Sequence, residues 1–252
     1  MKPDVLTRAL PFLTVTLIVI VWELAVSFFE IPEYILPRPS SIAQAFQFLD
    51  FEQWFQHAWS TLRVALLAFI ISFVIALITG IALTQSKWLS ACVYPLLVII
   101  QAIPVIAVAP IIIVIFGSED TTRILISVLI TFFPLAISIT TGLKETPSEL
   151  IELSQSLRGN TWRAFTQIRI PYAIPHIFVG AKVSITLCII GTVVAEFMAA
   201  DQGLGYLIQF STSMFKVPQA WASLTVLVAV TLSLFQSVCG VQKVCFPWSL
   251  KR

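Results

Sequence analysis

Long apolar runs separated by short polar segments dominate this chain. A helix that crosses a bilayer needs about 20 mostly apolar residues, because the hydrocarbon core is about 30 Å thick and a helix rises about 1.5 Å per residue. The qualifying runs lie at Ala9–Phe29, Val64–Thr84, within Trp88–Gly117, and at Ile124–Leu143, His176–Phe197 and Ala220–Val241. The pattern predicts an all-α integral membrane protein with six transmembrane helices.

The third run, Trp88–Gly117, is too long for one straight span. Pro95, Pro104 and Pro110 interrupt it, and proline removes a backbone hydrogen bond that lipid cannot replace. We expect an interfacial lead-in followed by a kinked membrane helix.

A polar segment, Glu30–Ser60, separates the first two runs. Ser40 or Ser41 is expected to cap a short amphipathic helix from about Ile42 to Leu49. His57 is expected to be a surface histidine, because the chain has only one other histidine and no metal-site spacing.

Composition agrees with a membrane location: 58% of residues are hydrophobic and only 11% are charged. The net charge of +2, carried by scattered Lys and Arg, argues against a nucleic-acid partner. The first run lacks a small-residue cleavage site, so it is expected to remain as a signal anchor. The cysteines show no paired metal spacing and are expected to be packing residues: Cys92, Cys188, Cys239 and Cys245.

Basic residues near the ends of the runs predict the orientation, since Lys and Arg accumulate on the cytoplasmic side. With a cytoplasmic N-terminus, the outer segments hold only Arg38, Arg63, Arg123 and Lys216. The inner segments then hold Lys2, Arg8, Lys87, Lys144, Arg158, Arg163, Arg169, Lys243, Lys251 and Arg252. Both termini, and the segment between the fourth and fifth runs, are therefore expected in the cytoplasm.

That segment, Leu143–Pro175, is polar but patterned. Thr146-Pro147-Ser148-Glu149 fits a capping box that starts a helix with Pro147 at its first position. Gly159 is expected to end this helix, and Asn160 to cap a second short helix that Pro171 stops. A pair of short helices at the membrane face results, and pattern alone also allows an interfacial hairpin that only links two spans.

The two expected helices carry distinct faces. Spacing places Leu150, Leu153 and Leu157 on one face of the first helix, and Glu149, Glu152 and Ser156 on another. With Trp162 as a second apolar anchor and Arg158 and Arg163 beyond the break, the pair has the features of a docking surface.

The segment resembles the EAA loop of permease subunits of ABC importers. The resemblance rests on Glu152, Gly159 and the run Ile168-Arg169-Ile170-Pro171. Leu153 and Ser154 replace the family's alanines, Ile170 replaces a leucine, and Arg158 stands where the family often has its glycine. Three further stretches resemble the nitrate/sulfonate/taurine branch: Trp22–Val26, Ile31–Ser40 and Ile177–Ile208.

The resemblance implies a single permease domain over residues 1–252, with an N-terminal span at 9–29, a five-helix importer core at about 60–241 and a cytoplasmic coupling loop at 144–175. It also implies a multi-pass protein of the bacterial-type inner membrane, a second permease copy, an extracytoplasmic binding protein and cytoplasmic ATPase subunits. The implied coupling residues are Glu149, Glu152, Ser156, Leu157, Arg158, Gly159, Trp162 and Pro171.

The chain itself is expected not to hydrolyse ATP, because it has no phosphate loop of the form GxxxxGK followed by Ser or Thr. ATP and Mg are expected on the partner ATPase, and no cofactor or metal on this subunit. The branch implies a small solute such as nitrate, an alkylsulfonate, taurine or the thiamine pyrimidine.

Polar residues within the runs are candidates for lining the solute path: Gln101, Thr131, Ser138, Ser184, Thr186 and Glu196. Ser and Thr in membrane helices more often bond the backbone or a neighbouring helix. Glu196 near the outer end and Glu23 in the first run are expected to be mainly structural, with Glu196 tying down the loop that follows it.

Two other classes remain in view. An ion-driven secondary transporter would need an intramembrane relay of ionisable residues, for which only Glu23 and Glu196 are candidates. A membrane enzyme would need a nucleophile–base pair or a His/Asp/Glu cluster, and the sequence shows neither.

Overall fold

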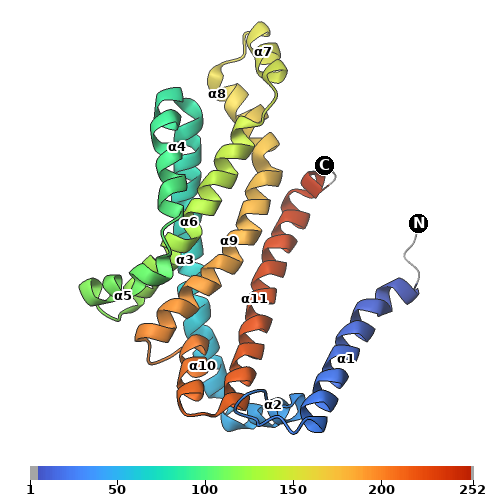
Figure 1. Cartoon of the computed structure of the whole chain (residues 1–252). Coiled ribbons are helices and arrows are strands. Elements are labelled where there is room, and N and C mark those ends of the chain that lie inside the picture. The colour runs from blue at the N-terminus through green and yellow to red at the C-terminus, as the bar shows by residue number, and fades with distance from the viewer. Residues whose placement is uncertain (1–4, 251–252) are drawn as a thin grey trace.

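The computed structural model describes residues 5–250 and is built of helices, with no strand among those residues. Figure 1 shows their arrangement. The long helices are α1 (Val5–Phe28), α3 (Phe51–Gln85), α4 (Lys87–Gln101), α5 (Val105–Phe116), α6 (Asp120–Lys144), α9 (Ile170–Ala199) and α11 (Val217–Cys245). The shorter elements are α2 (Pro39–Ala45), η1 (Phe46–Phe48), α7 (Ser148–Ser156), α8 (Thr161–Ala164), the π-helical turn η2 (Phe165–Arg169), α10 (Leu204–Ser213) and η3 (Pro247–Leu250).

Within the described residues, four helical runs are long and apolar enough to cross a membrane: α3, α6, the run Thr161–Ala199 that contains α9, and α11. The bent pair α4–α5 makes a fifth span if it is counted as one. The expected first span is represented by a shorter apolar stretch, Phe12–Phe28 of α1. The all-α membrane class is thus confirmed, whereas the count of six spans is only partly reproduced.

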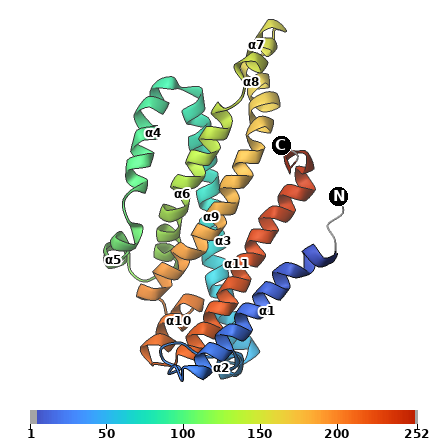
Figure 2. The same cartoon turned by 45° about the vertical axis from the view of Figure 1, so that its right-hand side comes forward.

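The third apolar run differs from the expectation of a lead-in and a kinked span. It forms two helices bent by 90°, and the break lies at Pro104, which is the N-cap of α5. Pro95 and Pro110 lie inside α4 and α5 without breaking them. It is α4 that runs along the bundle, while α5 turns sideways (Figure 2).

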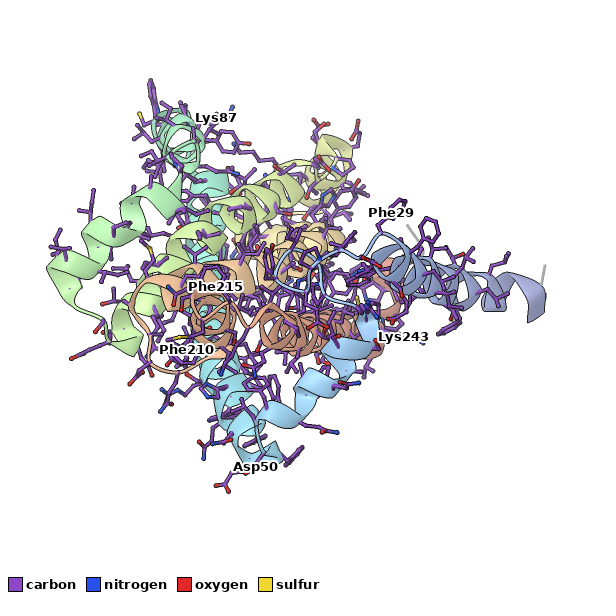
Figure 3. All side chains as sticks on the ribbon, turned by 60° about the horizontal axis from the view of Figure 1, so that its bottom comes forward. Phe29, Asp50, Lys87, Phe210, Phe215 and Lys243 are labelled. Atoms are coloured by element: carbon purple, nitrogen blue, oxygen red, sulfur yellow. The ribbon has the colours of Figure 1, made fainter. Side chains whose placement is uncertain are left out.

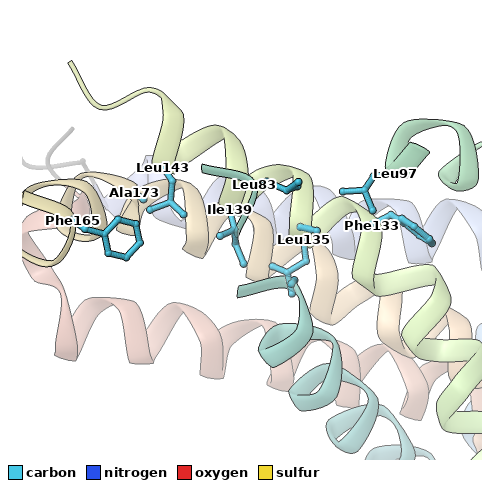
Figure 4. Packing of buried hydrophobic residues seen from close by; sticks show 10 residues of the cluster. Leu83, Leu97, Phe133, Leu135, Ile139, Leu143, Phe165 and Ala173 are labelled. Carbon is cyan, nitrogen blue, oxygen red and sulfur yellow. The ribbon is translucent and has the colours of Figure 1, made fainter. Parts of the chain in front are cut away.

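The core lies where α3, α6 and α9 pack together. Leu135, Ile139 and Leu143 of α6 are fully or almost fully buried and face Leu83 of α3 in the same cluster (Figure 4). At Gly191 of α9, a Cβ atom would lie 2.8 Å from the Cα of Ser127, so only glycine permits this approach of α9 to α6. Small residues at contacts let membrane helices gain packing energy that lipid cannot supply.

The connections sort to two ends of the bundle (Figures 1 and 2). The α7–α8 segment, the α3–α4 connection and the end of α11 lie at one end, and α2 and α10 lie at the other. This is the grouping that the charge count predicts for inner and outer segments, although which end faces the cytoplasm stays a prediction. Lys2, Lys251 and Arg252 lie outside the described residues.

The short helix after the first span starts earlier than expected. α2 begins at Pro39, so Ser40 and Ser41 lie in its first turn and do not cap it. The carboxylate of Glu23 accepts hydrogen bonds from the backbone N–H of Ser40 at 3.0 Å and from its hydroxyl at 2.8 Å. Glu23 therefore joins α1 to α2, the structural role expected of it.

Candidate functional site

The α7–α8 segment projects from one end of the bundle between α6 and α9 (Figures 1 and 2). α7 begins at Ser148, one residue later than the capping-box pattern predicts. The Thr146 hydroxyl donates to the carbonyl oxygen of Leu143 at 3.3 Å, which ties the bend between the two helices back to α6.

The C-terminal end of α7 is closed by Arg158 and Gly159 together. Arg158 adopts a left-handed conformation (φ 54°), the position that glycine usually fills at a helix end. The N–H of Gly159 then donates to the carbonyl oxygen of Ser154 at 2.8 Å. A Cβ on Gly159 would lie 2.6 Å from that oxygen and 2.5 Å from the Ser154 hydroxyl, so the predicted break needs glycine here for close approach.

α8 starts as predicted. Asn160 is its N-cap, and the Asn160 side-chain oxygen accepts a hydrogen bond from the N–H of Trp162 at 3.3 Å. This satisfies one of the N–H groups that every helix start leaves without an intrahelical partner.

The prediction that Pro171 stops the second helix is wrong. The chain stays helical from Thr161 to Ala199, with Pro171 in the first turn of α9. The reason is the π-helical turn Phe165–Arg169, in which the N–H of Ile170 bonds to the carbonyl oxygen of Phe165, five residues back. In a regular α-helix, the ring of Pro171 would collide with a backbone carbonyl one turn earlier. The wider π-helical turn directly before Pro171 moves those carbonyls, so the helix continues.

The segment is anchored in the bundle core. Phe165 is buried in the cluster that also contains Leu143 and Ala173 (Figure 4). Trp162 stacks on Phe165, with ring centroids 6.3 Å apart. A displacement of the loop would therefore be passed to the ends of α6 and α9, since close-packed contacts yield little.

The outward side of the segment is apolar at its centre. Leu153, Leu157 and Trp162 are 57%, 75% and 66% exposed, high values for such side chains. Around them, Glu149, Glu152, Arg158 and Arg163 are exposed as well. Apolar anchors inside a mixed-charge rim are typical of a surface that docks another protein.

Two hollows of about 530 Å³ flank the helix pair. The first is lined by Leu150, Leu153 and Leu157, which confirms that these residues share one face, and by Trp248 of the C-terminal segment. The second runs between Trp162 and Gln85 at the end of α3. The sequence reasoning missed Trp248, because nothing local in the last residues places them beside the loop.

The structure does not gather the candidate path residues into one site. Gln101 is exposed at the end of α4, whereas Thr131 and Ser138 lie on α6 and Ser184 and Thr186 on α9. The hydroxyls of Thr131 and Thr186 donate to carbonyl oxygens four residues earlier, and that of Ser138 to His176 of α9. Their role in a solute path stays a prediction.

Glu196 lies apart from these residues, at the start of the α9–α10 turn. It is 1% exposed and holds that turn through the N–H of Gly205, as the sequence reading expected. The expectation of a surface His57 is wrong: its ring is half-buried, stacks on Tyr206 and accepts a hydrogen bond from the N–H of Gly203 at 3.1 Å. No sequence signal joins residues this far apart.

Comparison with known proteins adds the following. Residues 72–247 match the family described as "Binding-protein-dependent transport system inner membrane component". The riboflavin transport system permease protein RibX of Chloroflexus aurantiacus is 35% identical over 236 residues, 93% of this chain and 88% of that protein. The formylaminopyrimidine transport permease protein ThiX of Halalkalibacterium halodurans is 28% identical over 242 residues, 96% of each chain. A solved inward-facing MetNI methionine ABC transporter chain shares the fold, with a TM-score of 0.64 and 19% identity over 75% of this chain and 94% of that chain.

Proposed function

The chain belongs to the family of binding-protein-dependent transport system inner membrane components, and we propose that its α7–α8 segment docks this permease subunit on a cytoplasmic ATPase that drives solute import. ATP and Mg would be bound and ATP hydrolysed on that partner. This subunit would supply part of the solute path and no catalytic group.

The observation that carries the proposal is the exposed apolar centre of the α7–α8 segment at the end of a rigid connection to the core. The apolar side chains of Leu157 and Trp162 are exposed to water, which is unfavourable. Burying them in an apolar groove would stabilise a complex by about 25 cal/mol per Å² of apolar surface. Phe165 links the same segment to α6 and α9. A closing partner would thus move membrane helices and not only bind to a loop.

We propose further that two copies of the chain form the membrane unit. α1 leans away from the bundle (Figures 1 and 2), and apolar residues along it such as Leu13, Leu17 and Leu24 are more than half exposed. Lipid or a second copy would have to cover this surface. A binding protein would meet the end of the bundle that carries α2 and α10, opposite the ATPase.

For the solute we propose a small heterocyclic compound of the vitamin or vitamin-precursor type. RibX and ThiX, both similar over nearly the whole chain, are named for riboflavin and for formylaminopyrimidine. A sulfonate or taurine would be the alternative. Of the four basic residues described at the α2–α10 end, Arg63 and Arg123 both pair with Asp120. Arg38 and Lys216 remain to attract an anion, which is a small positive charge for that purpose.

Co-expression with a candidate ABC ATPase tests the proposal. The chain should co-purify with that ATPase, and the complex should hydrolyse ATP faster when a solute-loaded binding protein is added. Glu152→Ala together with Gly159→Val should abolish the complex while the chain still inserts into membranes, and Thr212→Val on α10 should leave it intact. Solute uptake by the chain without any ATPase would overturn the proposal in favour of a gradient-driven transporter.

A further inference from the structure

The first turn of α10 is capped by residues of two other helices. Its N-cap, Gly203, has no side chain that could accept a hydrogen bond. The N–H of Leu204 instead donates to the hydroxyl oxygen of Thr61 on α3 at 2.8 Å, and the N–H of Gly205 to the carboxylate of Glu196 on α9 at 2.7 Å. The first N–H groups of a helix are usually bonded by a nearby capping residue, whereas in α10 two of them are bonded by side chains of α3 and α9.

Thr61 also joins the two caps. Its hydroxyl donates to the second carboxylate oxygen of Glu196 at 2.8 Å, so one side chain serves as donor and acceptor. Thr61 is fully buried and Glu196 is 1% exposed. A carboxylate buried this deeply is costly unless donors surround it, which makes these hydrogen bonds hard to give up. We call Thr61, Glu196 and the turn Gly203–Gly205 the α10 clasp.

The turn is shaped to fit the carboxylate. Gly203 has φ 122°, and a Cβ there would lie 2.3 Å from the carboxyl carbon of Glu196. A Cβ on Gly205 would lie 2.7 Å from the carboxylate oxygen to which it bonds. Both glycines are therefore required by close approach, and at Gly203 also by backbone conformation. His57 completes the clasp from α3, since it accepts from the N–H of Gly203.

The clasp lies at the far end of the same continuous helix that begins in the docking segment. From Ile170 to Glu196, α9 covers about 40 Å at about 1.5 Å per residue. α10 and the turn after it carry exposed residues, among them Phe210 and Phe215 on the face seen in Figure 3. A movement of α9 would therefore reach this surface only if α10 stays fixed to α9.

We propose that Thr61 and Glu196 are positioning residues for solute uptake: the α10 clasp makes α10 move with α3 and α9 when access alternates between the two sides. The proposal rests on the importer function given above. Without the clasp, α10 would be held by the chain and by the apolar packing of Leu204 and Leu207 against neighbouring helices. Apolar packing is not directional and sets no hydrogen-bonded register, so α10 would follow α9 less closely and ATP hydrolysis would be coupled less tightly to the presentation of its surface.

Thr61→Val and Thr61→Ser form the matched test. Valine keeps the shape of threonine but removes both hydrogen bonds, whereas serine keeps them. In the chain alone, inserted in lipid nanodiscs, amide hydrogen exchange of the peptide 200–210 should be at least tenfold faster in Thr61→Val and near the wild-type rate in Thr61→Ser. In the assembled transporter, the solute taken up per ATP hydrolysed should fall at least tenfold in Thr61→Val only.

Thr225→Val on α11 is the control, because the Thr225 hydroxyl is exposed and donates only to Trp221 of its own helix. If amide hydrogen exchange of the peptide 200–210 is unchanged in Thr61→Val, the clasp is refuted. If exchange is faster but the amount of solute taken up per ATP hydrolysed is unchanged, the role of the clasp in uptake is refuted. If Thr61→Val does not insert, Glu196→Gln carries the same two measurements. A wild-type chain that imports without an ATPase would refute the proposed function while the exchange data still decide the clasp.

Discussion

The N–H of Gly159 donates to the carbonyl oxygen of Ser154 at 2.8 Å and closes the C-terminal end of α7. The atoms that a Cβ on residue 159 would meet are the oxygen of this bond and the Ser154 hydroxyl. This hydrogen bond and the left-handed Arg158 thus hold the turn that leads from α7 to α8.

Gly159→Ala should therefore reorient α7 without unfolding the bundle. The clash costs about 1–3 kcal/mol unless the turn shifts, and the exposed turn can shift more easily than the core. Affinity for the ATPase should fall at least tenfold, as measured by titration of the detergent-solubilised chain. Gly240→Ala is the matched control, because a Cβ at Gly240 on α11 would meet no atom within 4 Å. Equal affinity of Gly159→Ala and wild type would show that the Gly159 geometry is irrelevant for docking.

Arg158→Gly should stabilise the same turn. Arg158 holds a left-handed conformation that glycine adopts at about 1 kcal/mol less cost. Limited proteolysis between α7 and α8 should become severalfold slower. Arg158→Gln separates conformation from charge, because glutamine lacks the guanidinium but pays the same cost for this backbone. Arg163→Gly, inside α8, should have the opposite effect, and faster cleavage in Arg158→Gly would contradict the argument.

The predictions that held are those that depend on local chemistry. The end of α7 near Gly159 and the cap of α8 at Asn160 follow from residues a few positions apart. The helix stop at Pro171 failed because a π-helical turn, stabilised by burial of Phe165 in the core, accommodates the proline. Burial against distant helices cannot be deduced from the local pattern.

The α10 clasp shows the same limit more sharply. A carboxyl group in an apolar run, such as that of Glu196, needs a partner, but Thr61 lies 135 residues before Glu196 in the sequence. His57 lies 146 residues before Gly203, and its local sequence predicts a surface residue. Single-sequence reasoning can indicate that such a group needs a partner, and only the fold identifies it.

Trp162→Ala should weaken docking while leaving the fold intact. The Trp162 side chain is 66% exposed, so its truncation should change the stability of the chain by less than about 1 kcal/mol. Because Trp162 is proposed as an apolar anchor, its truncation should lower the affinity for the ATPase at least tenfold. Leu143→Ala, at a residue 1% exposed, should instead destabilise the chain by about 2–5 kcal/mol. Thermal unfolding and ATPase titration of the two variants would distinguish the roles, and a destabilised Trp162→Ala with unchanged affinity would contradict them.

The native cysteines can test the orientation of the chain. Cys245 is exposed at the end of α11, near the α7–α8 end, whereas Cys188 is fully buried and donates to the carbonyl oxygen of Ala65. In a Cys92→Ser, Cys239→Ser background, a membrane-impermeant maleimide should label Cys245 in inverted vesicles and not in right-side-out ones, because only an exposed thiol in contact with the reagent reacts. Cys188 should stay unlabelled in both until the chain is denatured.

The reciprocal variant makes this test decisive. Lys216 is exposed between α10 and α11, at the opposite end of the bundle from Cys245. Lys216→Cys, placed in the same background with Cys245→Ser, should react in right-side-out vesicles only. If Cys245 reacts in right-side-out vesicles and Lys216→Cys in inverted ones, the α7–α8 segment faces away from the cytoplasm and no cytoplasmic ATPase could bind it. Labelling at the two positions therefore decides the premise on which the docking proposal depends, before any partner has been purified.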